Sequence, residues 1–236
     1  MTPNLPLSLA STSPRRRQLL REAGVAFELL TAPVDEDALT ATYTGRLDEL
    51  GEFLAREKAY AGRAALREMR RVGRVLASDT TVLLDGEHLA KPVDADDATR
   101  MLRRLRGRVH LVATGVALTT TEADDCLSAT SRTRVEMRAY SDEEIAAFVA
   151  TGDPMDKAGA YSIQHPDFQP VAAFHGCHLG VIGLPNCIVA ALIAGAALPP
   201  EAGARSSPCR WSPLCTPPLP GPDDVSHGTG RPGDAK

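Results

Sequence analysis

Three arginines stand in the first turn of a predicted helix near the start of the chain, in the segment LASTSPRRRQLLREAG. Ser13 has the side chain of a good helix N-cap and Pro14 suits the first helical position, so the helix is expected to begin here. The N-terminus of a helix is the positive pole of its dipole, where each cation costs roughly 0.3–1 kcal/mol. Arg15, Arg16 and Arg17 therefore indicate a strongly negative partner, unless the run is only the solvated face of an arginine-rich protein.

Lysine is rare in this chain, which has 26 lysines and arginines in total but only four lysines. Three of the four stand in short polar segments: Lys58 in REKA, Lys91 in AKPVD and Lys157 in DKAGAY. Such positions can require the compact ammonium and flexible side chain of lysine, which arginine does not replace. Because there are only four lysines, their placement can also be due to chance. If these ammonium groups converge with Arg15 and Arg16, they form a site for several negative charges, as in a polyphosphate.

Asp79 is the acidic residue that such a site would need for chemistry. It stands at the end of a predicted strand, in ASDTT, between the hydroxyls of Ser78 and Thr80. A carboxylate among cations and phosphates can hold a divalent metal, or it can orient and deprotonate an attacking water. Asp35 or Glu36 is a candidate second carboxylate, and the set indicates metal-assisted hydrolysis of a polyphosphate. Taken alone, Asp79 would be better explained as a cap at a strand end.

Other site chemistries have less support in the sequence. The P-loop pattern GxxxxGK[ST] does not occur, so phosphate binding of that kind is excluded. His175, Cys177 and His178, with Cys187 further on, leave a structural zinc site as an alternative. Their spacing matches no standard pattern of four zinc ligands, which makes core or loop positions the preferred interpretation.

The elements that must position these residues alternate between strand and helix. Apolar alternation and β-branched runs predict strands at 5–11, 25–32, 74–90 (a hairpin turning at Asp85-Gly86), 109–121, 127–140 and 171–182. Caps and helical spacing predict helices at 13–24, 46–71, 94–107, 141–152 and 186–197, with a capping box at Ser141 and an acidic loop at 35–37. This order predicts a mixed α/β (α+β) fold, with one partly antiparallel sheet flanked by helices. The polar segments then lie in loops on a rigid scaffold, where function is usually found.

The composition is that of an ordinary globular domain followed by a tail of different character. The 236 residues are 43% hydrophobic, with a net charge of −4 and a pI of about 5.9, which argues against a nucleic-acid binder. No apolar run approaches the ~18 residues of a membrane span. Five cysteines without paired spacing favour a reducing cytoplasm. Residues 1–198 are assigned to the domain, and the proline-rich residues 199–236 to a disordered tail.

Six motifs, taken in order, resemble the Maf family of nucleoside triphosphate pyrophosphatases over roughly residues 5–198. They are LASTSPRRRQLL, REKA, ASDTTVLLDGEHLAKP, LRGRVHLVATGVAL, GDPMDKAGAYSIQ and VIGLP. The resemblance implies hydrolysis between the α and β phosphates, giving a nucleoside monophosphate and pyrophosphate, with a divalent cation, Mg²⁺ or Mn²⁺. DKAGAY followed by IQ is similar to the branch that acts on dTTP and UTP. Modified pyrimidine triphosphates are further expected substrates.

The resemblance also implies roles for individual residues. Asp79, in the DT motif, is the expected proton acceptor, and Asp79 and Glu36 are the expected metal ligands. Arg15, Thr80 and Gln164 are expected to set substrate choice. Substrate binding is expected from a set of basic and hydroxyl side chains: Arg15, Arg16, Lys58, Lys91, Lys157, Ser11 and Ser13. Family members are often dimers, so a cytoplasmic homodimer is one expected form, without a nucleic-acid or membrane partner.

The chain departs from the family pattern around the IQ pair. His165 and Pro166 stand where the family usually has glycine, Asp153 replaces the glutamate of a GEP triplet, and Gly180 stands where a larger residue is common. These changes concern the expected base pocket more than the phosphate end. Two alternatives stay open: a regulator that binds nucleotide or DNA without turnover, and the same chemistry on 7-methyl-GTP or another purine triphosphate.

Overall fold

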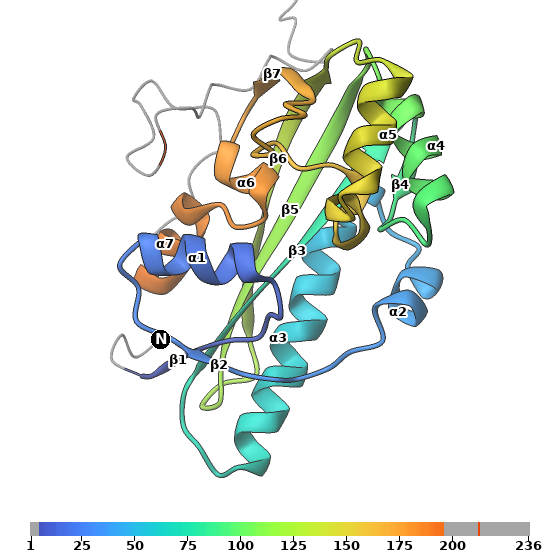
Figure 1. Ribbon diagram of the computed structural model, residues 1–236. Coiled ribbons are helices and arrows are strands. Elements are labelled where there is room, and N and C mark those ends of the chain that lie inside the picture. Colours follow the sequence, from blue (N-terminus) through green and yellow to red (C-terminus); the bar gives the residue numbers. More distant parts are fainter. Residues whose placement is uncertain (1–4, 196–211, 213–236) are drawn as a thin grey trace, which may run out of the picture.

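A computed structural model describes residues 5–195 and 212 of the chain. Within those residues, seven strands form one mixed sheet in the order β2-β1-β3-β5-β6-β7, with β4 paired to β3 (Figure 1). β1 is parallel to both β2 and β3, and the other pairs are antiparallel, which confirms the predicted mixed fold. Apart from Ser212, the predicted tail at 199–236 lies outside the described residues. The strands are β1 Leu7–Leu9, β2 Glu28–Leu29, β3 Arg74–Leu84, β4 Glu87–Leu89, β5 Val109–Thr120, β6 Cys126–Met137 and β7 Val171–His175.

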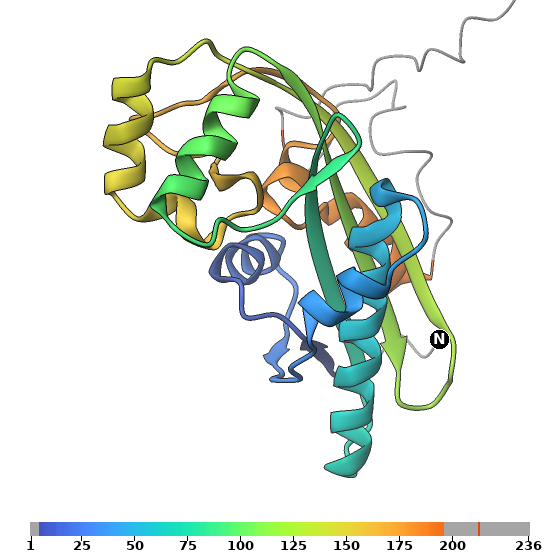
Figure 2. The ribbon, with the colours of Figure 1, turned by 90° about the vertical axis from the view of Figure 1, so that its right-hand side faces the viewer.

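The helices pack on the sheet in three groups (Figures 1 and 2). The long helix α3 packs on β3, β5 and β6, and α2 contacts α3. Helices α6 and α7 pack on β5 and β6, and α1 contacts α6. Helices α4 and α5 pack against each other and stand above α1 in Figure 2. None of the helices in the described part of the chain has both the length and the apolar content needed to cross a bilayer. Their bounds are α1 Pro14–Glu22, α2 Glu36–Thr42, α3 Leu50–Glu68, α4 Ala95–Leu105, α5 Asp142–Ala150, α6 His178–Ile182 and α7 Asn186–Ala194.

Alternation along the central strands divides the core between the two faces of the sheet. Val75 and Ala77 of β3 pack in one cluster with the apolar residues of α3. Leu76, between them in sequence, packs in a second cluster with residues of α1, α6 and α7. Successive side chains of a strand point to opposite faces of the sheet. The continuous apolar run in β3 is therefore explained by burial of the strand on both faces. A third cluster joins the far ends of β3 and β5 to α4 and α5.

The middle of β3 is paired on one side only among the described residues. β1 pairs with the first three residues of β3, and β4 pairs with Val82–Leu84 at its other end. Residues 77–81 are paired with β5 but with neither β1 nor β4. This gap holds Asp79 and Thr80, whose side chains point to opposite faces of the sheet. An uncovered stretch of strand edge is thus where residues from both faces can meet.

Helix α3 begins in backbone contact with the sheet. A Cβ atom added to Gly115 of β5 would lie 2.2 Å from the Cα of Glu52, and one added to Gly51 would lie 3.1 Å from the carbonyl oxygen of Asp79. Side chains between a helix and a sheet normally keep the two backbones much further apart. Because Asp79 and Gly115 are paired in the sheet, this contact fixes the start of α3 beside Asp79.

A buried polar pair lies in the cluster under α4 and α5. His110 Nε2 and the Tyr161 hydroxyl are 2.7 Å apart, and the two residues are 3% and 6% exposed. Burial lowers the pKa of His110 to about 4 and raises the pKa of Tyr161. At neutral pH both side chains are therefore uncharged, and the pair is a neutral hydrogen bond in an apolar environment.

Several sequence expectations are confirmed and others are wrong. Ser13 caps α1 with Pro14 in the first turn, and Ser141 forms the predicted capping box. The segment 171–182 is not one strand, because β7 ends at His175 and Cys177 caps the short helix α6. The acidic segment 35–37 is not a loop, because Asp35 accepts a hydrogen bond from Ala38 N and so caps α2. The strand expected at 25–32 is reduced to Glu28–Leu29.

The glycine at position 115 can be tested by substitution. Gly115→Ala should lower the free energy of unfolding by about 3 kcal/mol, because the added methyl group overlaps the backbone of α3. Gly73→Ala is the matched control, since its added Cβ meets nothing closer than 3.1 Å. Urea unfolding of the two variants measures the difference. Equal stability of the two variants would contradict the close packing of α3 on β5.

The buried imidazole predicts a dependence of stability on pH. In the unfolded chain His110 takes up a proton near pH 6.5, whereas the folded protein holds it neutral down to about pH 4. Stability is therefore lost as the pH falls through this window, by about 2 kcal/mol from this group between pH 7.5 and 5. His110→Gln removes the titrating group, so its unfolding free energy should fall less over the same range. Parallel pH profiles of the two proteins would refute the burial of a neutral imidazole.

Candidate active site

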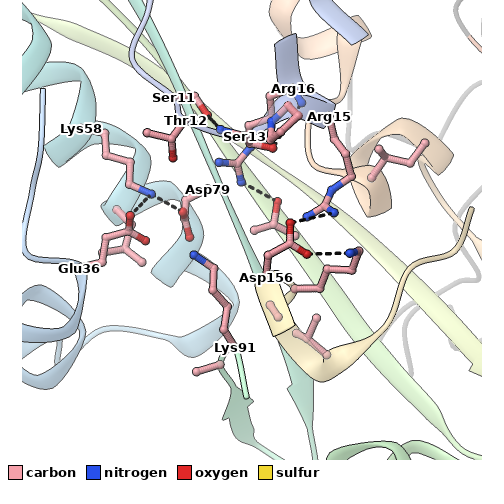
Figure 3. A pocket seen from close by; sticks show the side chains of 18 of the residues that line it. Ser11, Thr12, Ser13, Arg15, Arg16, Glu36, Lys58, Asp79, Lys91 and Asp156 are labelled. Atoms are coloured by element: carbon pink, nitrogen blue, oxygen red, sulfur yellow. Dashed lines mark hydrogen bonds and ion pairs between the residues drawn. The ribbon is translucent and has the colours of Figure 1, made fainter. Parts of the chain in front are cut away.

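A pocket of about 1030 Å³ opens where the edge of β3 is uncovered. Its walls come from the β1–α1 loop, the start of α2, helix α3, the middle of β3, the loop after β4 and the segment 156–164. Figure 3 shows side chains from these segments pointing into one space. Every site residue expected from the sequence lines this pocket: Ser11, Ser13, Arg15, Arg16, Glu36, Lys58, Asp79, Thr80, Lys91, Lys157 and Gln164.

Lys58 joins the two expected metal-binding carboxylates. Its Nζ lies 2.6 Å from Asp79 Oδ1 and 2.9 Å from Glu36 Oε1. Lys58 and Asp79 are 8% and 7% exposed, while Glu36 lies at the start of α2 on the open side. A buried carboxylate without a partner would be strongly disfavoured, so the contact with the ammonium compensates for the burial of Asp79. Among the described residues, Lys58 is the only hydrogen-bond donor to the Asp79 carboxylate, and the second oxygen, Oδ2, remains available.

Arg16 is held by contacts with two other segments of the fold. Its Nε donates to the carbonyl oxygen of Gly183 at 3.0 Å, and one Nη donates to Thr80 Oγ1 at 3.2 Å. The Thr114 hydroxyl of β5 donates to Gly180 O at 2.7 Å and so accepts from the Thr80 hydroxyl, 3.0 Å away. Burial lowers the pKa of Arg16, and the nearby Asp79 opposes that effect. An arginine stays charged under such a shift, so a fixed guanidinium faces the pocket.

Arg15 crosses the mouth of the pocket to Asp156. Its Nη lies 3.5 Å from Asp156 Oδ2, and Lys157 Nζ lies 2.6 Å from Asp156 Oδ1 (Figure 3). Burial raises the pKa of Asp156, but the hydrogen bond from Lys157 and the charge of Arg15 outweigh it and hold that pKa below its usual value. Lys157 also contacts Asp153 at 3.0 Å, so its charge is largely compensated within its own segment. Of the expected cations, Lys157 is therefore the least available to a ligand.

Lys91 differs from the other basic residues of the pocket. Its side chain is exposed, and no ion pair or hydrogen bond involves it in the described part of the chain. Figure 3 shows its ammonium pointing toward Asp79 from the loop that follows β4. That loop is tied to the opposite wall by the hydrogen bond from Gly159 N to Ala90 O, at 3.1 Å. Lys91 is therefore a positive charge without a partner in the described chain, on a backbone that is tied to the opposite wall.

The residues that depart from the family pattern do not line the pocket. His165 accepts a hydrogen bond from Phe168 N through Nδ1, and its ring packs edge-on against Phe148. Gly180 lies behind the pocket, where an added Cβ would be 2.9 Å from Ser131 Oγ. Asp153 and Pro166 are also outside the lining. None of these four residues lines the pocket, so any effect of the departures on the base pocket must be indirect.

Sequence reasoning missed three residues of the site. Asp156 holds Arg15 and stands next to Lys157 in the DKAGAY motif, which could have identified it. Tyr161, which lines the pocket, ends the same motif, whereas Thr114, which contacts Thr80, gave no local signal because its partner is distant in sequence. No group of three or more His, Cys, Asp or Glu able to hold a metal ion occurs in the described chain, which gives the alternative of a zinc site no support there.

The geometry defines what the pocket can do chemically. Several cations face it from three sides, which suits a ligand with several negative charges. Asp79 lies among them with one carboxylate oxygen bonded to Lys58 and the other available. A carboxylate so placed can accept a proton from a water molecule held beside the bound anion.

Comparison with known proteins gives a consistent result. The family model described as "Maf-like protein" matches residues 6–196. A dTTP/UTP pyrophosphatase of Ralstonia nicotianae is 44% identical over 204 residues, covering 83% of this chain and 96% of the relative. Proteins of the same name from Pelotomaculum thermopropionicum and Geobacter sulfurreducens are 42% and 43% identical over 179 and 181 residues. These alignments cover 75% and 77% of this chain, and 89% and 91% of the relatives.

The family match therefore spans all of the segments that line the pocket. The resemblance inferred from the motifs is confirmed, and the chain belongs to the Maf family.

Proposed function

We propose that this protein hydrolyses dTTP and UTP between the α and β phosphates, releasing the nucleoside monophosphate and pyrophosphate. The observation that carries the proposal is the convergence of four cations and a buried carboxylate around one pocket: Arg15, Arg16, Lys58, Lys91 and Asp79. The names of the similar proteins support the choice of substrates. We also propose a cytoplasmic location, where these nucleotides are held and where a free thiol such as that of Cys126 persists.

Phosphate binding is assigned to the cations that the pocket leaves accessible. Arg16 offers a fixed guanidinium, and Lys91 can move toward a ligand because the described chain gives it no competing partner. Arg15 can exchange Asp156 for a phosphate oxygen, since their contact at 3.5 Å is long. Lys58 stays beside Asp79 and adds positive charge on the opposite wall. The hydroxyls of Ser11 and Ser13 add short donors at the start of α1, and Lys157 contributes mainly by holding Asp156.

Asp79 is proposed as the general base. Its available carboxylate oxygen takes a proton from water as the water oxygen attacks the α-phosphorus. The bond between the α-phosphorus and the oxygen that bridges to the β-phosphate breaks, and pyrophosphate leaves with that electron pair. The charge that develops on the phosphate oxygens is stabilised by Arg16, which is held in position before the reaction, and by Arg15 and Lys91, which turn to the bound phosphates.

The residues present fit a divalent cation. Asp79 and Glu36 offer carboxylate oxygens that already converge on one point, the Lys58 ammonium. Oxygen donors suit Mg²⁺ and Mn²⁺, and Mg²⁺ usually binds through one or two carboxylates together with phosphate oxygens and water. We therefore assign Asp79 and Glu36 as the protein ligands. When bound, the cation would polarise the phosphate oxygens and neutralise part of their charge.

Base selection is proposed for three residues that line the pocket: Arg15, Thr80 and Gln164. Thr80 is held by Arg16 and Thr114, so its hydroxyl has a defined orientation. Gln164 lies on the opposite wall, with an exposed side chain whose amide can both donate and accept hydrogen bonds. The edge of a uracil or thymine base offers both functions as well. Arg15, between the phosphates and this wall, completes the set proposed for substrate choice.

Asp79→Asn tests the proposed base. The amide cannot accept the proton, so kcat for dTTP should fall by roughly a thousandfold, while nucleotide affinity measured by calorimetry stays within a few-fold. Asp124→Asn, at an exposed carboxylate paired with Arg67, is the matched control and should keep full activity. A nearly normal rate for Asp79→Asn would show that another group accepts the proton.

A panel of nucleotides tests the substrate and separates the alternatives. The purified protein is incubated with dTTP, UTP, ATP, GTP and 7-methyl-GTP in the presence of Mg²⁺ or Mn²⁺, and pyrophosphate release is measured. Highest kcat/KM with dTTP and UTP is expected. Preference for a purine nucleotide would correct the substrate, and binding without release from any nucleotide would favour a non-catalytic regulator.

Removal of the cation gives a further prediction. Chelation with EDTA should abolish pyrophosphate release, and Mg²⁺ should restore it. Glu36→Gln should raise the Mg²⁺ concentration at half-maximal rate by roughly tenfold, because one anionic ligand is lost. Glu68→Gln, at an exposed site at the end of α3, is the control. The same Mg²⁺ dependence in both variants would remove Glu36 from the ligand set.

A further inference from the structure

The wall of the pocket that carries Gln164 has an irregular backbone. Residues 158–160 form one short 3₁₀ turn, and within it Gly159 and Ala160 both have positive φ, at 69° and 59°. This conformation is easy for glycine but disfavoured for alanine, so surrounding contacts must hold Ala160 in it. The local sequence does not by itself favour this backbone conformation, so contacts with the rest of the fold must hold the wall in place.

Two contacts anchor this wall to the sheet. Gly159 N donates to Ala90 O at 3.1 Å, next to Lys91. Tyr161 inserts its ring into the core, where its hydroxyl lies 2.7 Å from His110 Nε2 and the rings pack edge to face at 85°. His110 belongs to β5 and pairs with Val135 of β6, next to Leu111, where pairing with β3 begins. The Tyr161 side chain thus connects the pocket wall to the central strands of the sheet.

The contact between His110 and Tyr161 is the only side-chain hydrogen bond that either residue makes among the described residues. His110 Nδ1 is buried and has no hydrogen-bond partner in the described structure, and the Tyr161 hydroxyl makes no other hydrogen bond there. One donor of the pair stays unsatisfied in either orientation: the tyrosine proton if Nε2 donates, or the Nδ1 proton if the tyrosine donates. Loss of either partner would leave a further buried polar atom without a hydrogen bond, so each side chain depends on the other.

We propose that His110 is a positioning residue for substrate choice: its hydrogen bond with the Tyr161 hydroxyl holds Ser162–Gln164 against the base of the bound nucleotide. His110 does not line the pocket, whereas Tyr161 and the three residues after it do. The inference rests on the proposed pyrophosphatase function and extends it to a residue that acts only through Tyr161. A looser wall would bind pyrimidine bases less well and discriminate less against purine bases.

Tyr161→Phe and His110→Phe test the proposal in the full-length protein. Each variant removes the hydrogen bond and keeps an aromatic ring in the core. For both, KM for dTTP and UTP should rise and the ratio of pyrimidine to purine kcat/KM should fall by about tenfold, as expected for one lost hydrogen bond. The kcat for dTTP should stay within about threefold, since the phosphate end is unchanged. His110→Gln keeps an acceptor and should restore most of the ratio.

Tyr140→Phe is the matched control. Tyr140 is buried in the same cluster, and its hydroxyl donates to Leu102 O at 2.8 Å, but the residue does not line the pocket. It should lower the melting temperature about as much as Tyr161→Phe without changing the pyrimidine to purine ratio. If Tyr161→Phe and His110→Phe behave in the same way as Tyr140→Phe, their role is only structural and the inference is overturned.

The design separates this inference from the function on which it rests. The wild-type protein is assayed with the same nucleotides, and absence of pyrophosphate release from it would refute the proposed function together with the inference. If the wild type prefers dTTP and UTP but the variants keep that preference, only the role of His110 is refuted. Should His110→Phe fail to fold, Tyr161→Phe alone decides, because it removes a single oxygen atom.

Discussion

The backbone contact between α3 and β5 is the constraint on which the site depends. Only a glycine at position 115 lets the first turn of α3 lie directly on the sheet. Asp79 is the neighbour of Gly115 across the β3–β5 ladder, so the helix is fixed beside it. Lys58, less than two turns further along α3, then reaches the Asp79 carboxylate at 2.6 Å. A helix held at an ordinary distance would leave the acid and the ammonium apart, and the buried charge would have no partner.

The rest of the pocket follows from the way β3 is bordered. Because β1 and β4 pair only with its ends, the middle of β3 is free to present residues from both faces to one space. Asp79 meets Lys58 from the side of α3, and Thr80 meets Arg16 from the side of α1. The positive pole of α1 and its arginines therefore face the same ligand as the acid. The cost of placing arginines at that end of a helix is explained by an anionic occupant.

Local chemistry made part of this structure predictable, and long-range contacts determined the rest. The Ser13 cap, the Ser141 capping box and the turn at Asp85-Gly86 depend only on neighbouring residues, and all three are present. The segment 171–182 reads as one strand because a short apolar run does not distinguish a strand from a helix. In the structure, an N-cap at Cys177 begins α6 within this segment. The charged residues of the site were identifiable by type. Thr114 and His110, which contact site residues, are uncharged at neutral pH. Their partners, Thr80 and Tyr161, lie 34 and 51 positions away in the sequence, so no local pattern identifies them.

The uncovered stretch of β3 also affects how the folded protein behaves toward other copies of itself. A free strand edge offers peptide groups to any passing extended segment and is a common starting point for aggregation. Here that edge is short and lies inside a recess lined by charged side chains of both signs, which protects it from pairing with a second chain. A wider recess would expose more of the edge, so the size of the recess affects resistance to aggregation as well as the fit of a ligand.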